Sequence, residues 1–183
     1  VITIPLTSFE NSQENDGLYQ LNVKVTDKSG RETTQTVYFT INRFGSVYIY
    51  DQAIINMQQN QYTQKVTDDF VITEYNADKL EGPGEITVTK DGTKLTLEED
   101  KDYTIAPESK SVGWYQYKYT IKKEVFTEDG VYKLSVASKD AAENNSETVN
   151  ANMVLDSESG SVSNKEILFY VDTTKPEITS ING

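Results

Sequence analysis

Residues 15–27 read Asn-Asp-Gly-Leu-Tyr-Gln-Leu-Asn-Val-Lys-Val-Thr-Asp, and residues 128–140 read Glu-Asp-Gly-Val-Tyr-Lys-Leu-Ser-Val-Ala-Ser-Lys-Asp. Both stretches place Asp-Gly directly before a segment in which Tyr, Leu and Val alternate with other residues. A second pair follows, since Val37-Tyr-Phe-Thr-Ile-Asn42 aligns with Ile167-Leu-Phe-Tyr-Val-Asp172. Self-similarity of this kind indicates that one structural unit is used twice along the chain.

Around this repeat, apolar and polar residues alternate with a period of two, as in Leu21–Val25, Glu85–Thr89 and Leu134–Val136. Such alternation predicts strands that are half buried on one face of a sheet. The dipeptide Asp91-Gly92 predicts a tight hairpin turn in which both residues have positive φ. Only residues 51–59 carry a helical pattern, and it is weak, so we expect an all-β fold.

The repeat also predicts where the units begin and end. Residues 1–45 would hold only the C-terminal strands of a first module, which is therefore incomplete. Residues 46–175 would form a complete module, and residues 176–183 would begin a following one at Pro176. Because a small isolated sheet is marginally stable, the first unit needs either further strands or packing on its neighbour.

The repeated Asp-Gly-x-Tyr-x-Leu-x-Val resembles the tyrosine corner of immunoglobulin-like sandwiches, with Tyr19 and Tyr132 in the tyrosine role. The segments Ser138-Lys-Asp-Ala-Ala-Glu-Asn144 and Phe169-Tyr-Val-Asp-Thr-Thr-Lys-Pro-Glu-Ile178 resemble the strand end and the junction of bacterial immunoglobulin-like (Big-type) repeats in Gram-positive surface proteins. The resemblance implies immunoglobulin-like β-sandwich modules in tandem, displayed outside the cell. Members of such arrays are usually stalks or adhesins.

The composition argues against several other classes of protein. With 17 Lys+Arg against 29 Asp+Glu, the net charge of −12 disfavours nucleic acids and anionic membranes as partners. The absence of Cys and His removes disulfides, ordinary zinc sites and His-dependent nucleophilic catalysis. No apolar run approaches the ~20 residues of a membrane-spanning helix. We expect no enzyme activity, no cofactor and no membrane insertion of this segment.

One aromatic stretch is a candidate ligand surface. In residues 114–119, alternation places Tyr115, Tyr117 and Tyr119 on the expected core face and leaves the other face to Trp114, Gln116 and Lys118. An aromatic ring beside an amide and an ammonium group could stack on a sugar ring and bond its hydroxyls. The competing interpretation is that Trp114 plugs one end of the sandwich.

Two acidic segments are candidate calcium sites, because Ca²⁺ prefers clustered carboxylates. Glu98-Glu-Asp-Lys-Asp102 lacks the spacing of an EF-hand loop, which favours a solvated turn. Asp68-Asp69 has no obvious acidic partner segment. We therefore expect no metal at either place.

The leading expectation for function is a non-catalytic spacer or stalk module of an extracellular, cell-surface or cell-wall-associated protein, with a role in adhesion. Its partners would be neighbouring immunoglobulin-like modules of the same chain. One alternative is a module that binds a glycan or a host surface protein through Trp114 or through the loop of residues 146–163. Another is an accessory region of a secreted polysaccharide-degrading enzyme.

Overall fold

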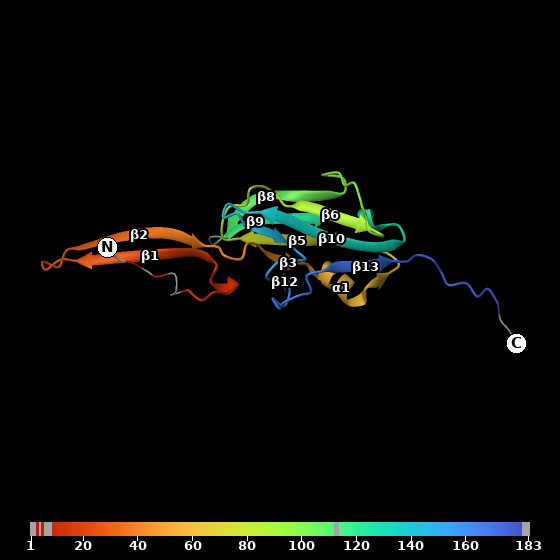
Figure 1. Ribbon diagram of the computed structural model, residues 1–183, viewed down its shortest axis with the longest axis horizontal. Coiled ribbons are helices and arrows are strands. Elements are labelled where there is room, and N and C mark those ends of the chain that lie inside the picture. Colours follow the sequence, from red (N-terminus) through yellow and green to blue (C-terminus); the bar gives the residue numbers. More distant parts are fainter. Residues whose placement is uncertain (1–2, 4, 6–8, 112–113, 181–183) are drawn as a thin grey trace.

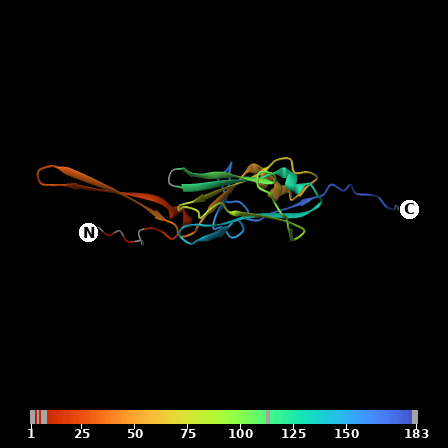
Figure 2. The same cartoon turned by 90° about the horizontal axis from the view of Figure 1, so that it is seen from above.

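The computed structural model describes residues 3, 5, 9–111 and 114–180. Within these residues the chain forms a two-stranded hairpin, a larger two-sheet body and an extended C-terminal segment, arranged along one long axis (Figures 1 and 2). The hairpin follows the 3₁₀ helix η2 (Gln13–Asn15) and consists of β1 (Gly17–Thr26) and β2 (Glu32–Ile41). Ile2 and Ile4, where alternation suggests a further strand, lie outside the described residues.

The body is built from two sheets. One has the strand order β12-β3-β5-β9-β8, with bounds Val154–Asp156, Val47–Tyr50, Phe70–Asn76, Trp114–Ile121 and Tyr103–Ser111. The other has the order β4-β13-β10-β6-β7, with bounds Tyr62–Thr63, Ile167–Val171, Gly130–Lys139, Glu85–Lys90 and Thr93–Lys94, and β11 (Asn145–Glu147) pairs with β10. Most pairs are antiparallel, but β12–β3 and β13–β4 are parallel.

The core lies between the two sheets. Alternate residues of β5 and β13 are buried, as the period-two pattern predicts. Apolar side chains from both sheets and from the helix described below form a single buried cluster, whose largest members are Tyr48, Tyr50, Ile54, Phe70, Ile72, Tyr119, Ile121, Phe126, Tyr132, Leu134 and Phe169. Because each fully buried large apolar side chain contributes about 1.5–3 kcal/mol, this cluster is the main source of the body's stability. The protein is therefore mostly β and sandwich-like.

The weak helical pattern at residues 51–59 does form a helix, α1 (Gln52–Asn60). Asp51 caps its N-terminus by accepting a hydrogen bond from the Ile54 N–H at 3.0 Å, and its second oxygen accepts one from the Val71 N–H. Ile54 and Ile55 bury the helix against the sheets, and Gln61 ends it in the left-handed conformation. The helical pattern thus forms one short capped helix in a fold that is otherwise mostly β.

The hairpin turn predicted at Asp91-Gly92 is confirmed. Asp91 has φ 50° and Gly92 has φ 80°, and the turn joins β6 to β7. Positive φ at both central residues matches the right-handed twist of the strands that the turn connects.

The two copies of the repeat share the same hydrogen bond at their tyrosines. The Tyr19 hydroxyl donates to the Asn15 carbonyl at 2.6 Å, and the Tyr132 hydroxyl donates to the Glu128 carbonyl at 3.0 Å. In each case the acceptor lies four residues upstream of the tyrosine, which is the type of bond that a tyrosine corner makes.

The two copies also share an aromatic arrangement. Tyr19 stacks on Phe39 with centroids 5.6 Å apart, and Tyr132 stacks on Phe169 at the same separation and interplanar angle. A third ring packs edge-on against each tyrosine: Phe9, which precedes η2, against Tyr19, and Phe126 of the body against Tyr132. The repeated residues therefore make the same hydrogen bond and the same ring stacking in both copies.

We predict that Tyr132→Phe lowers the free energy of unfolding by about 1 kcal/mol, because it removes the hydroxyl that fixes the start of β10 and leaves a carbonyl without that partner. Urea denaturation measures the change. Tyr170→Phe is the control, since the Tyr170 ring is half exposed in the neighbouring strand β13. Equal effects of the two substitutions would contradict the structural role of Tyr132.

Candidate functional site

The predicted ligand residues lie on one face of β9. Gln116 is half-buried and pairs across the sheet with Tyr75, while Lys118 is exposed and pairs with Thr73. The opposite face of β9 carries Tyr119 and Ile121 into the core. Gln116 and Lys118 therefore lie on the outer surface of the sheet, where both polar groups are available to a ligand.

Trp114 lies at the end of this row, next to the hairpin. A methyl group built on Gly17 would lie 3.5 Å from Trp114 Cζ2, so the indole packs on the glycine at the start of β1. The Trp114 side chain is half-buried as a result. The structure places Trp114 at the joint between hairpin and body, and its ring is not a fully open platform for a sugar.

The loop of residues 146–163, the other predicted ligand region, is ordered by its own hydrogen bonds. It includes part of β11 and all of β12, and Asp156 accepts bonds from the N–H groups of Glu158 and Ser159. Val162 is 72% exposed on it. The loop is thus a defined surface with an apolar residue at its rim.

In both acidic segments a carboxylate accepts a hydrogen bond from a backbone N–H group of the protein. The Asp102 carboxylate accepts a hydrogen bond from the Glu98 N–H, and the Asp69 carboxylate accepts one from the Lys123 N–H. In the part of the chain that the structure describes, no group of three acidic residues is arranged to hold a metal ion. Within the same residues, no helix is long and apolar enough to span a bilayer.

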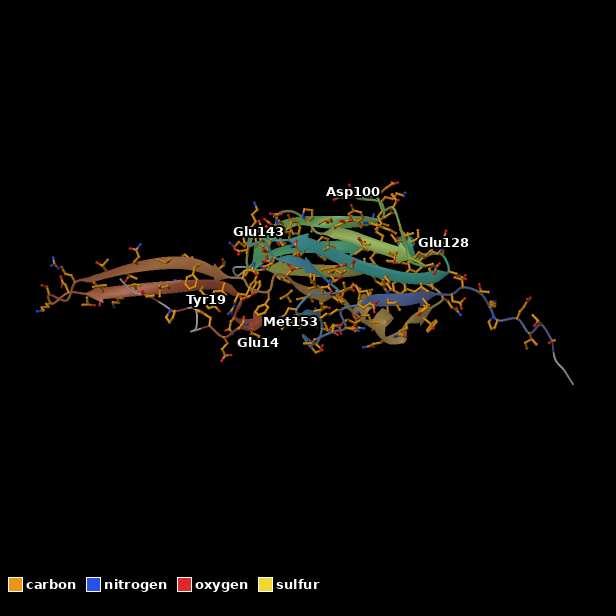
Figure 3. The ribbon with its side chains drawn as sticks, viewed as in Figure 1. Glu14, Tyr19, Asp100, Glu128, Glu143 and Met153 are labelled. Carbon is orange, nitrogen blue, oxygen red and sulfur yellow. The ribbon has the colours of Figure 1, made fainter. Side chains whose placement is uncertain are left out.

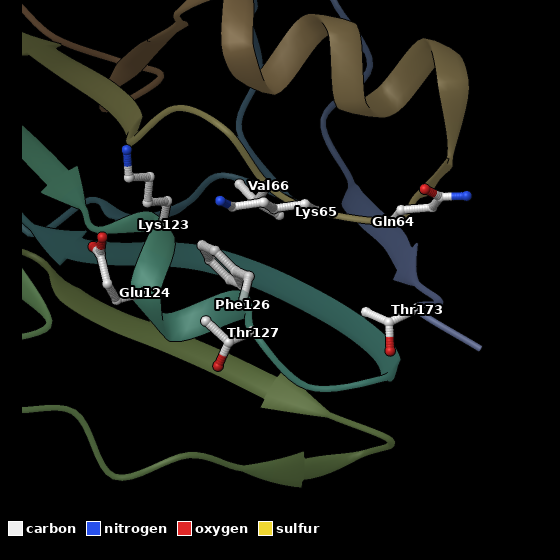
Figure 4. A pocket seen from close by; sticks show the side chains of 8 residues that line it. All are labelled: Gln64, Lys65, Val66, Lys123, Glu124, Phe126, Thr127 and Thr173. Carbon is white, nitrogen blue, oxygen red and sulfur yellow. The ribbon is translucent and has the colours of Figure 1, made fainter. Parts of the chain in front are cut away.

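An open pocket of about 420 Å³ (Figure 4) lies where the chain leaves β13, at the end of the body that Figure 1 shows away from the hairpin. Its lining side chains are Gln64, Lys65, Val66, Lys123, Glu124, Phe126, Thr127 and Thr173. Lys123 donates a hydrogen bond to the Thr67 carbonyl, and Phe126 belongs to the core. Thr173 follows β13 closely, so the pocket lies beside the point at which the chain leaves β13 toward the C-terminus.

The most elaborate polar site lies at the opposite end, where the hairpin joins the body. Asn42 follows β2, and its side-chain amide donates to the Asn76 side chain at 2.9 Å and to the Asp140 carboxylate at 2.8 Å. Asn76 is fully buried in β5, and Asp140 is 1% exposed after β10. One side chain of the linker thus ties both sheets of the body to the hairpin.

Asp140 is the hub of this site. One oxygen accepts hydrogen bonds from the N–H groups of Ala142 and Asn144, and the other accepts from the amides of Asn42, Asn76 and Asn144. Burial raises the pKa of the Asp140 carboxyl, but the hydrogen bonds from Asn76, Asn144 and Asn42 outweigh burial and hold the pKa below its ordinary value. Five donors around one carboxylate stabilise its charged form.

A second buried carboxyl group lies beside the hub. Glu74 is fully buried in β5 and accepts hydrogen bonds from the hydroxyls of Ser46, Ser138 and Tyr119. Burial, reinforced by the nearby Glu74 charge, raises the pKa of Tyr119 and of Tyr48 far above the ordinary tyrosine range. The two tyrosines therefore stay neutral and act as donors, and the cluster is a structural polar core.

In both copies of the repeat, an aspartate at the start of the copy accepts hydrogen bonds from the segment that follows its last strand. The Asp16 carboxylate accepts hydrogen bonds from the N–H groups of Arg43 and Phe44, directly after the last strand of the hairpin. The Asp129 carboxylate accepts from the Thr173 N–H and hydroxyl, directly after β13. An aspartate before each repeated glycine thus holds the segment that leaves the unit.

Sequence reasoning identified Tyr19, Tyr132 and the Asp140–Asn144 motif but missed Asn42, Glu74 and Asn76. A signal was present, because Glu74 and Asn76 continue the alternation that places Phe70 and Ile72 in the core. A charged residue at a core-facing position requires buried partners. Those partners come from distant segments, so their identity is visible only in the fold.

We predict that Asp140→Asn lowers the free energy of unfolding at neutral pH by about 2–3 kcal/mol, because an added amide faces three amide donors. The native carboxyl has a lowered pKa in the folded state. Its contribution is therefore complete above its unfolded pKa, ~3.9, and is lost as the pH falls through the lower folded value. Urea titrations between neutral and acidic pH measure both effects.

Asp27→Asn is the matched control for Asp140→Asn. The Asp27 carboxylate accepts from the N–H groups of Ser29 and Arg31, with the same spacing as Asp140, but it lies on the exposed hairpin tip. Its substitution is expected to leave the stability of the body unchanged. A loss of body stability as large as that for Asp140→Asn would contradict the special role of the buried hub.

No family model matches the chain, and the search of curated proteins gives no match.

Proposed function

We propose that the chain is a non-catalytic spacer segment of an extracellular, bacterial surface protein, built from immunoglobulin-like units in tandem. The observation that carries the proposal is the joint between hairpin and body. A stiff spacer holds its units at a fixed angle, and here the linker is anchored by buried hydrogen bonds. Asn42 reaches Asn76 and Asp140, and the Ser46 N–H donates to Ser146.

The shape supports the same proposal. The hairpin and the C-terminal segment leave opposite ends of the body, so the chain runs through it from end to end (Figures 1 and 2). Figure 3 places Glu143 and Met153 at the hairpin end and Glu128 at the opposite end. Asp16 and Asp129 each hold the segment that leaves a repeated unit, as the joints of an array would require. Units connected in this way extend an array without requiring any ligand.

We predict that Asn42→Ala makes the joint flexible, because it removes the bonds from the linker to both sheets. The chain has no cysteine, so Lys28→Cys on the hairpin and Thr96→Cys on the body provide unique spin-label positions. The width of the distance distribution between the labels should increase roughly twofold in pulsed electron paramagnetic resonance.

Asn145→Ala, at an exposed asparagine of β11, is the control and should leave this distribution narrow. A broad distribution in the unsubstituted protein would contradict the proposed spacer role. An unchanged distribution in Asn42→Ala would show that this residue does not fix the joint.

Glycan binding is the second candidate, and one feature favours it. Tyr62 is 65% exposed and stacks on Tyr170 with centroids 4.6 Å apart. Tyr62 lines a pocket of about 420 Å³ whose polar lining includes Asn56, Asn60 and Asp68. Exposed aromatic rings beside amide and carboxylate groups match the apolar faces and hydroxyls of a sugar.

If glycans bind there, Tyr62→Ala should weaken binding of cello-, xylo- or chito-oligosaccharides at least about tenfold in isothermal titration calorimetry, since the stacking ring supplies much of the contact. Tyr38→Ala, at a 62% exposed tyrosine of the hairpin, is the control. The absence of heat with all three sugar classes, or equal losses in the two variants, would count against this candidate.

A further inference from the structure

The hairpin presents an apolar face that the described residues cover only in part. Phe9 packs edge-on against Tyr19 and Phe39, and the rest of the face stays exposed. The pairing of β1 with β2 places Tyr19 opposite Phe39 and Leu21 opposite Val37, so these side chains share one face. Val37 is 47% exposed and Val25 is 62% exposed on this face. Exposed apolar side chains gathered on one strand pair indicate an interaction surface.

The body shows what covers such a face. In β10 and β13 the equivalent pairs are Tyr132 opposite Phe169 and Leu134 opposite Ile167. All four side chains are at most 2% exposed, because they pack in one cluster with residues of the other sheet, including Tyr48, Ile72, Tyr119 and Ile121. Phe70 of β5 makes direct ring contact with Phe169 at 5.5 Å.

The hairpin also lacks a strand at one edge. In the body, β10 pairs with β13 on one side and with β6 on the other, over Tyr132–Ala137. In the described residues β1 pairs only with β2, so the equivalent edge, Tyr19–Lys24, has unpaired backbone groups. A free strand edge is a template for the addition of another strand.

We propose that the apolar face and free edge of the hairpin form a docking surface for a β-sheet segment built like residues 46–121. That segment would place strands equivalent to β3, β5 and β9 over Tyr19, Leu21 and Phe39, and a strand equivalent to β6 along β1. The side chains of the hairpin point to this partner. Tyrosine, leucine and phenylalanine recur at the same paired positions in the body, where such a segment covers them. This inference rests on the tandem units of the proposed function, but not on their role as a spacer.

The test is a chimeric chain in which residues 46–120 precede residues 4–183, because Ile4 aligns with Ile121 in the repeat. The added segment carries the sheet that the hairpin is inferred to require. Hydrogen exchange of the β1 and β2 amides should slow at least about a hundredfold relative to the natural chain, because these strands become part of a closed core. The amides of residues 47–171 report folding of the body in the same sample.

Two variants of the chimera sharpen the test. Leu21→Ser lies on the apolar face and should abolish the added protection, whereas Asn22→Ser lies on the opposite face and should preserve it. Hairpin amides that exchange as fast as in the natural chain would overturn the proposal, and so would a chimera that fails to fold. Concentration-dependent dimerisation of the natural chain that protects the hairpin would also overturn it, because the occupant would then be a second copy.

Discussion

The carboxylate of Asp140 is the interaction on which the arrangement of the molecule depends. It accepts hydrogen bonds from the linker, from a buried strand and from its own loop. A buried charge is costly unless it is fully hydrogen-bonded, so these segments are held together by the need to satisfy one group. The hairpin cannot change its angle to the body without breaking the Asn42 part of this set.

The rest of the body supports that hub. Glu74 and its three hydroxyl donors form a second layer of polar contacts, and Tyr119 links this layer to the Gly84 N–H at 2.7 Å. Gly84 has no room for a larger residue, since an added Cβ would lie 2.7 Å from a Val136 methyl group. Below the polar layer the apolar cluster supplies most of the stability. The polar end thus fixes orientation, and the apolar middle maintains the fold.

The sequence was sufficient for the features that are local or repeated. Alternation predicted the strands, Asp91-Gly92 predicted a turn with two positive φ values, and the repeated tyrosines pointed to matching hydrogen bonds. It did not predict the contacts of Asn42, which depend on residues far apart in the chain. Nor did it place Trp114 against Gly17, because two strands meet there only through the angle of the joint.

The central claim is that the hairpin and the body behave as one stiff unit because their linker is anchored in a buried polar site. Residual dipolar couplings of the backbone amides in the natural chain test this claim most directly. We predict that couplings from β1 and β2 and those from the sheets of the body fit a single alignment tensor of one magnitude. A separate, markedly weaker tensor for the hairpin would show that it moves independently and would contradict the account.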